Sequence, residues 1–178
     1  TSGSLATTSL TWTPLLEGRY NVTVYARPVP GETIVSNNIL STNVEVREAK
    51  VFRVPQDFAK IQDAVDSAIS GVGDTVYVKS GTLYENVVVN KAVSLVGEKC
   101  STTIIHGWIE IRANDVNISS FTLSSSNLVA VYLHLVAGCN VFNNTITNNR
   151  DGIYISFSSS NNVFGNNITN NDAIGVAL

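Results

Sequence analysis

The chain has 178 residues, which is enough for one or two domains with a substantial core. Charged residues make up 14% of it and hydrophobic residues 44%, and this balance, with abundant Ser, Thr, Asn and Val, favours a β-rich extracellular type of protein over a helical cytosolic one. A net charge of −3 without any cluster of Lys and Arg excludes a nucleic-acid-binding surface.

The sequence starts at Thr1 and contains no methionine, so we expect a segment of a longer protein. The lack of a signal peptide in such a segment says nothing about export. No apolar run approaches the length of a membrane span, and we expect a soluble segment without one.

Residues 1–48 contain three runs of alternating apolar and polar residues, at 9–14, 19–26 and 39–46, which predict strands of an antiparallel sheet. Tyr20 follows Gly18 at the start of the second run, a placement that resembles the tyrosine corner of immunoglobulin-like sandwiches. Together with Trp12, the pattern looks like the last strands of the adhesion-like modules of archaeal and bacterial surface proteins. We therefore predict that residues 1–48 are the C-terminal part of such a sandwich, with its other strands upstream.

One helix is predicted, over residues 58–69. Its apolar stripe has helical spacing and consists of Ile61, Ala64, Val65 and Ala68. Asp57 is the expected N-cap, and Gly71 or Gly73 ends the helix. Since only strands and turns follow, the helix is placed to cap the open end of a solenoid core.

Apolar residues after Asp74 recur every 22 or 23 positions in three interleaved series. The first series is Val87 and Val89, Ile109 and Ile111, Val131 and Leu133, Ile153 and Ile155, Val176 and Leu178. The second is Leu95, Ile118, Val141 and Val163, and the third is Leu123, Ile146 and Ile168. Three series with one period predict three sheets that each receive one strand per repeat, as in a parallel β-helix with coils of about 22 residues.

Asparagine follows the same period. It tolerates the left-handed backbone of sharp corners, and its amide can bond to the equivalent residue one coil away. We expect such ladders at the pairs Asn144/Asn166, Asn148/Asn170 and Asn149/Asn171.

The stretches "VPQDFAKIQDAVDSA", "GDTVYVKSGTLYENVVVNKAVSLVGE" and "TTIIHG" resemble the opening of pectin-lyase-like proteins. The later "NNTITNNRDGIYI" repeats look like the NosD-like branch of that superfamily, the carbohydrate-binding and sugar-hydrolase repeats. The resemblance covers residues 51–178 and implies the N-terminal cap and first coils of a right-handed parallel β-helix. It does not fix an activity, because the superfamily contains lyases, esterases, glycosidases, copper-site accessory proteins and plain surface proteins.

Catalytic chemistry of that superfamily is not visible in these repeats. An esterase would need a carboxylate pair with Gln and Arg, a lyase an acidic calcium site beside a basic residue, and an inverting hydrolase two carboxylates facing one sugar. Three aspartates of the repeats lie in turns and are not stacked at one register: Asp115, Asp151 and Asp172. The two arginines of the coils, Arg112 and Arg150, do not have several acidic residues near them in the sequence. We expect no catalytic residues in this segment.

Metal ligands are scarce as well. Copper sites use thioether and imidazole ligands, whereas the sequence has no Met and only two histidines, His106 and His134. Cys100 and Cys139 show no metal spacing, and two buried free thiols are favoured over a single disulfide bridge. We expect neither a metal nor another cofactor.

One outer face carries a candidate binding site. If the Val87 series points inward, alternation turns six side chains outward on a single sheet: Trp108, Glu110, Arg112, Tyr132, His134 and Tyr154. Aromatic rings pack on the apolar faces of sugars, and the resemblance implies a substrate groove along one outer sheet, so a polysaccharide or surface glycan is the candidate partner. The alternative is that tyrosine is present because it favours strands and packs against its cross-strand neighbours.

Four sequons, at Asn21, Asn117, Asn143 and Asn167, allow N-glycosylation of an exported protein, although an Asn- and Thr-rich repeat also produces them by chance. The sequence as a whole predicts a non-catalytic extracellular or cell-surface β-helix module for structural display or carbohydrate binding. The alternative is a fragment of a carbohydrate-active enzyme (a polysaccharide lyase, esterase or glycosidase) whose catalytic coils lie beyond Leu178.

Overall fold

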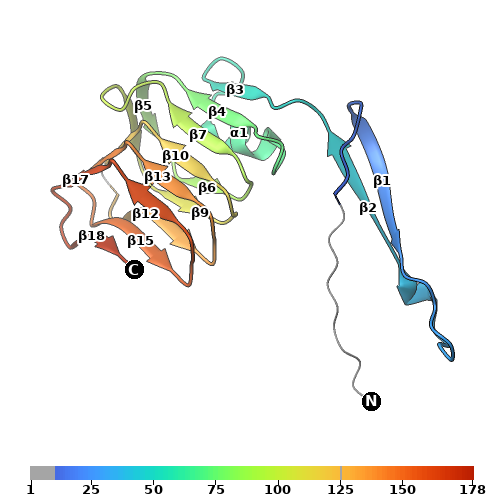
Figure 1. Cartoon of the computed structure of the whole chain (residues 1–178). Coiled ribbons are helices and arrows are strands. Elements are labelled where there is room, and N and C mark those ends of the chain that lie inside the picture. The colour runs from blue at the N-terminus through green and yellow to red at the C-terminus, as the bar shows by residue number, and fades with distance from the viewer. Residues whose placement is uncertain (1–10, 125) are drawn as a thin grey trace. The chain divides into compact units, whose positions relative to one another are not determined.

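The computed structural model describes residues 11–124 and 126–178, and the chain divides into two compact units, Thr1–Glu48 and Ala49–Leu178 (Figure 1). In the first unit, β1 (Gly18–Tyr25) pairs antiparallel with β2 (Ile39–Val46), and the short 3-10 helix η1 (Ser36–Asn38) leads into β2. These two strands match two of the three that the alternation predicts.

The remaining predicted strand covers residues 9–14. This prediction is wrong for residues 11–14, which form no strand, and residues 9 and 10 lie outside the described residues. Pro14 has no amide hydrogen for a strand ladder, and Trp12 packs edge-on against Tyr20 with ring centroids 4.9 Å apart. Tyr20 makes the expected upstream bond, because its hydroxyl donates to the carbonyl oxygen of Leu16 at 2.7 Å. The assignment of residues 1–48 to an immunoglobulin-like sandwich stays a prediction.

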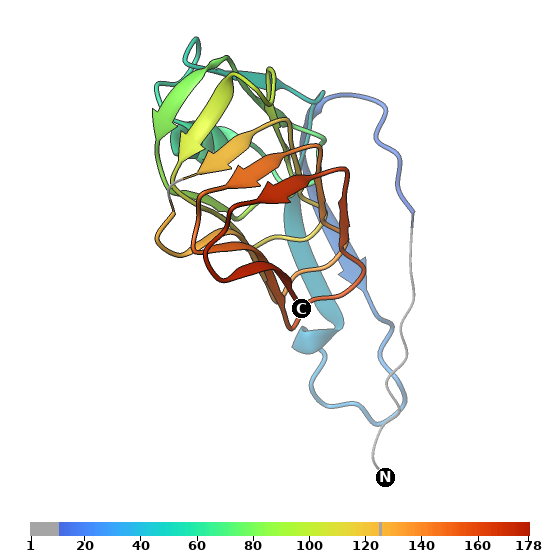
Figure 2. The ribbon, with the colours of Figure 1, turned by 90° about the vertical axis from the view of Figure 1, so that its left-hand side faces the viewer.

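The second unit is a parallel β-helix built from three sheets whose strands stack coil upon coil (Figures 1 and 2). Sheet 1 contains β3 (Val51–Val54), β4 (Thr75–Val78), β7 (Ser94–Gly97), β10 (Asn117–Ser119), β13 (Asn140–Phe142) and β16 (Asn162–Phe164). Sheet 2 contains β5 (Gly81–Tyr84), β8 (Thr103–His106), β11 (Thr122–Ser124), β14 (Thr145–Thr147) and β17 (Asn167–Thr169). Sheet 3 contains β6 (Val87–Val89), β9 (Ile109–Ile111), β12 (Val129–His134), β15 (Asp151–Ser156) and β18 (Ile174–Ala177).

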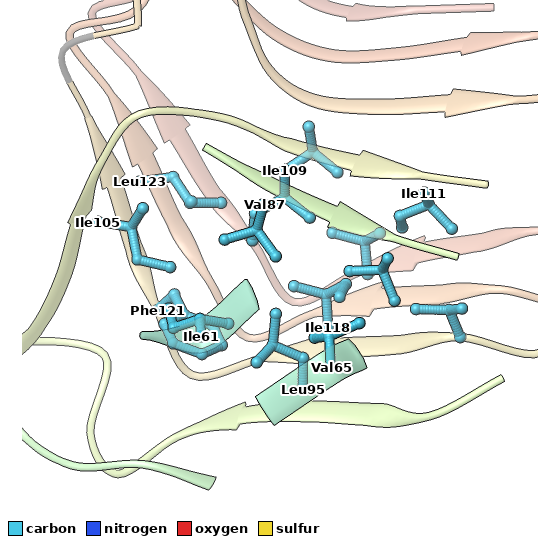
Figure 3. Packing of buried hydrophobic residues seen from close by; sticks show 14 of the residues in the cluster. Ile61, Val65, Val87, Leu95, Ile105, Ile109, Ile111, Ile118, Phe121 and Leu123 are labelled. Carbon is cyan, nitrogen blue, oxygen red and sulfur yellow. The ribbon is translucent and has the colours of Figure 1, made fainter. Parts of the chain in front are cut away.

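The pairing register confirms the three apolar series. In sheet 3, Val131 pairs with Ile109 on one side and Ile153 on the other. Ile118 lies between the equivalent positions of the second series in sheet 1, and Leu123 pairs with Ile146 in sheet 2. These side chains are fully buried in one continuous core, and Figure 3 shows the part of this core at the helix and the first coils. The last members of the series are not fully buried: Val163 and Ile168 are partly buried, and Val176 and Leu178 are 45% and 96% exposed.

The capping helix α1 (Ile61–Ser67) is shorter than predicted. Asp57 does not cap it, because its carboxylate accepts from the backbone amide of Arg53 at 2.8 Å. The carboxylate of Glu85 accepts instead from the amides of Ile61 and Gln62, at 3.0 and 2.8 Å. The predicted apolar stripe is buried against the core, where Ile61 and Val65 lie below the first coils (Figure 3). The helix thus covers the end of the core, as predicted. It begins at Ile61, where the Glu85 carboxylate accepts hydrogen bonds from backbone amides that have no partner within the helix.

Two of the three predicted asparagine ladders are present. The side-chain amide nitrogens of Asn144 and Asn149 each donate to the oxygen of the asparagine one coil on, both at 3.1 Å. The third pair is wrong as a ladder: Asn148 and Asn170 have left-handed φ angles of 57° and 54°, and they are linked by a backbone bond, from the Asn148 amide to the Asn170 carbonyl at 3.0 Å. Asparagine therefore forms left-handed corners at positions 148 and 170, and it forms side-chain ladders at the neighbouring positions 149 and 171.

Candidate functional site

The six side chains predicted to face outward all belong to one region of sheet 3. Tyr132 pairs with Glu110 of β9 on one side and with Tyr154 of β15 on the other. Trp108 immediately precedes β9 and Arg112 immediately follows it, while His134 ends β12. Their apolar strand neighbours are buried in the core, so the pleat leaves these side chains on the outer surface. The structure brings all six together; we call this surface the sheet-3 face.

Aromatic rings are continuous across this face. The ring centroids of Tyr132 and Tyr154 are 5.6 Å apart, and the ring of His134 stacks on that of Tyr132, also at 5.6 Å. Phe157, which the sequence reasoning did not include, lies edge-on to His134 at 5.9 Å. Tyr154 is 39% exposed, so its ring is available to a partner.

Polar groups lie beside the rings. Glu110 and Arg112 form a salt bridge of 2.8 Å, and the hydrogen bond and negative charge of Glu110 raise the pKa of Arg112. The hydroxyl of Ser156 is 2.7 Å from Nδ1 of His134 and 3.1 Å from the hydroxyl of Tyr132. The sequence reasoning did not include Ser156 in the site. Its position, 22 residues after His134, nevertheless indicates that it occupies the equivalent place in the next coil. The face therefore offers fixed hydrogen-bonding groups next to apolar rings.

A hollow of ≈ 310 Å³ lies at the start of the sheet-3 strands, lined by Trp108, Glu110, Leu128, Val129 and Tyr132. Leu128 and Val129 were not predicted as site residues. The Leu128 side chain is 57% exposed. Because Leu128 lies before β12, the alternation of inward and outward residues in that strand does not predict which way its side chain points. The hollow combines apolar walls with one ion-paired carboxylate.

Candidate metal ligands are scattered. The two histidines lie on different sheets, and Nδ1 of His106 is 3.0 Å from the hydroxyl of Ser124. Both cysteines are free; Cys139 is buried, which raises the pKa of its thiol, whereas Cys100 is only partly buried, contrary to expectation. Within 11–124 and 126–178 there is no group of three or more His, Cys, Asp or Glu that could hold a metal ion.

The predicted sequons differ in accessibility. Asn21, Asn143 and Asn167 are exposed. Asn117 is half-buried in an unpredicted ladder of sheet 1: its amide nitrogen donates to Ser94 Oγ at 3.2 Å, and its oxygen accepts from Asn140 at 2.8 Å. A glycan on Asn117 would replace one of the two hydrogens on this half-buried amide nitrogen. Helices long and apolar enough to cross a membrane do not occur in the described part of the chain.

Comparison with known proteins gives two matches. The profile of a family described as "Periplasmic copper-binding protein (NosD)" matches residues 60–178. A cell surface glycoprotein of Methanothermus fervidus is 33% identical over 107 residues, which are 57% of this chain and 18% of that protein. The chain thus spans less than a fifth of the length of this relative. No solved structure matches the chain.

Proposed function

This chain belongs to the NosD family, and on that premise we propose that its β-helix is a non-catalytic module of a cell-surface or secreted protein that binds carbohydrate on the sheet-3 face. The family description names a periplasmic protein and the relative is a cell surface glycoprotein, and both descriptions support a place outside the cytoplasm. Three exposed sequons are consistent with such a place. The partner we propose is a polysaccharide or surface glycan.

The observation that carries this proposal is the contact between rings and fixed polar groups. Sugar rings have apolar faces that pack on aromatic side chains, and hydroxyl edges that need hydrogen-bond partners. Tyr132 and Tyr154 supply adjacent ring faces. Glu110, Arg112 and Ser156 supply acceptors and donors that are already held in place by one another or by a neighbouring side chain. Such preorganised groups lose little side-chain entropy when a ligand binds.

A carbohydrate-active enzyme is the second candidate, and structural display without a ligand is the third. The carboxylates nearest this face do not favour catalysis, because hydrolysis of a glycosidic bond needs two carboxylates that flank one sugar. Glu110 is paired with Arg112 at 2.8 Å, and Asp151 lies 3.8 Å from Arg150. Each of these carboxylates is engaged by an arginine, an arrangement that suits hydrogen bonding to sugar hydroxyls.

Copper binding, which the family description names, does not fit the donor set of this chain. Copper sites use imidazole and thioether ligands, whereas the sequence contains no Met and its two histidines are each engaged by a serine on separate sheets. We expect titration with Cu(II) or Zn(II) to leave the melting temperature of the purified chain unchanged. Thermal melting at increasing metal concentration checks this, since a ligand of the native state must stabilise it by mass action. A melting temperature that rises with metal concentration would contradict the expectation.

Replacing Tyr154 tests the proposed function. Tyr154→Ala removes an exposed ring, and we expect the affinity for a glycan to fall about tenfold, which corresponds to a stacking contribution of about 1–1.5 kcal/mol. Tyr154→Phe keeps the ring face and is expected to bind within about twofold of the parent. A glycan array followed by calorimetry on the monomeric fraction measures both.

The matched control is Phe164→Ala, which removes an exposed ring from the outer side of sheet 1, where Phe164 stacks on Phe142 at 5.1 Å. We expect this control to bind like the parent. If Tyr154→Ala binds every tested glycan as the parent does, the sheet-3 face is ordinary β-surface and the display function remains.

A further inference from the structure

Left-handed backbone conformations mark the corners of the coils. Eight non-glycine residues in the described chain have positive φ, and six of them are small or polar: Asp115, Ser120, Asn143, Asn148, Ser160 and Asn170. The other two are Leu135, with φ of 56°, and Phe157, with φ of 48°. A bulky side chain is rare in this conformation because its Cβ crowds the following carbonyl oxygen. At this one corner the residue type conflicts with the backbone.

Leu135 and Phe157 occupy the same place in successive coils. His134 pairs with Ser156, so the residues that follow them, immediately after β12 and β15, are equivalent. Burial in the core does not account for the two apolar side chains, since Leu135 is 69% and Phe157 84% exposed. Strained residues that packing does not explain are a feature of functional surfaces.

Phe157 continues the rings of the sheet-3 face. Its ring contacts that of His134, which stacks on Tyr132, and Tyr132 in turn lines the hollow with Leu128. The aromatic and apolar surface therefore runs from Leu128 before β12 to the corner after it. The seven residue steps from Leu128 to Leu135 span roughly 23 Å along the strand direction.

We propose that Phe157, with Leu135 one coil earlier, is a ligand-contacting residue that extends the carbohydrate platform to this corner, so that a glycan lies along the strands and across the solenoid axis. The inference rests on the proposed function. A sugar chain fits this strip because it presents ring faces and hydroxyls in alternation, as the strip presents rings beside His134, Ser156 and the Glu110–Arg112 pair. A purely apolar ligand would exclude water from these polar groups without replacing the hydrogen bonds that water makes to them, which is costly.

Phe157→Asn separates binding from stability. Asparagine tolerates the left-handed conformation, so we expect the melting temperature to rise by about 2–4 °C. Loss of the ring is expected to weaken glycan binding about tenfold, while Phe157→Tyr keeps binding within about twofold of the parent. The matched control is Ser160→Asn, a left-handed corner of the same coil with φ of 54°, which is expected to bind like the parent.

Thermal melting and calorimetry with the same glycan decide between the outcomes. Weaker binding together with a higher melting temperature for Phe157→Asn supports the inference. If Tyr154→Ala loses affinity but Phe157→Asn binds like the parent, the platform ends before the corner, and the inference falls while the proposed function stands. If Phe157→Asn melts lower than the parent, the ring serves the fold, which also overturns the inference. If the parent binds no glycan, both proposals fail together.

Discussion

Replacing Ile153 by Asp is expected to abolish folding of the β-helix. The side chain is fully buried, and its Cα is registered between Val131 and Val176 in adjacent coils of sheet 3. A carboxylate there would have no cation or hydrogen-bond donor among apolar neighbours, and an unpaired buried charge costs about 3–5 kcal/mol or more. Domains of this size have only about 5–15 kcal/mol of stability. Circular dichroism and thermal melting of the purified variant measure the effect.

Tyr154→Asp is the matched control for this experiment, because Tyr154 follows Ile153 directly and points to the other side of the strand. We expect this control to fold and to melt cooperatively within a few degrees of the parent. The contrast between adjacent positions tests the register itself. A soluble Ile153→Asp protein with a cooperative melt near that of the parent would show that the inward column is misplaced.

Asn144→Ala is expected to lower the free energy of unfolding by about 2–4 kcal/mol. The Asn144 side chain is buried; its oxygen accepts from the amide of Phe121 at 3.0 Å, and its nitrogen donates to the carbonyl of Ile118 at 3.1 Å. Alanine would leave the buried Phe121 amide without its side-chain acceptor, at a cost of about 1–3 kcal/mol, and would remove the bond to the Ile118 carbonyl, which contributes about 1 kcal/mol. Urea unfolding followed by circular dichroism measures the change.

Asn162→Ala serves as the control for that loss. Asn162 also belongs to an asparagine ladder, donating to Asn140 at 2.9 Å, but it is exposed on the outer side of sheet 1. Water can replace its bond, so we expect a loss below about 1 kcal/mol. Equal losses in the two variants would mean that ladder bonds, rather than the satisfaction of buried backbone groups, account for the stability that asparagine contributes.

The repeat made the coils predictable from sequence. A period of 22 or 23 residues fixes which residues stack, and the period of two within each strand fixes which of them face inward. Three apolar series therefore determined three sheets and their registers, and the same logic turned Trp108, Tyr132 and Tyr154 to one outer face. Extending the outer columns by one period also leads from His134 to Ser156 and from Leu135 to Phe157.

Features set by contacts between coils were not predictable in this way. Local spacing placed the start of the helix near Asp57, but α1 begins at Ile61 because Glu85, which lies 24 residues later, accepts from its first amides. Asn148 has the same periodic signature as Asn149, yet only Asn149 turns inward, where its side chain reaches the carbonyl of Leu123. The hollow beside Leu128 depends on the corner before β12, which has no periodic signature of its own.

The pleat of sheet 3 links the fold to the proposed function, because burial of one series of side chains in the core turns the alternate series outward. A coil needs its inward residues for stability, whereas its outward residues are free to vary with little cost to the fold. This division allows aromatic and charged side chains to gather on one sheet while the solenoid beneath remains regular. Substitutions of the outward residues within the sheet-3 strands, such as Tyr154→Ala, are therefore expected to change the proposed glycan affinity with little change in melting temperature.

The most direct test of the proposed carbohydrate binding on the sheet-3 face is nuclear magnetic resonance of the aromatic side chains during titration with a glycan identified on the array. We expect saturable shifts of the Tyr132, Tyr154 and Trp108 ring signals, all with one dissociation constant. Phe142 and Phe164, stacked on the outer side of sheet 1, form an internal control whose signals should not move. Shifts confined to the Phe142 and Phe164 rings, or no shift of the sheet-3 rings at a saturating glycan concentration, would contradict it.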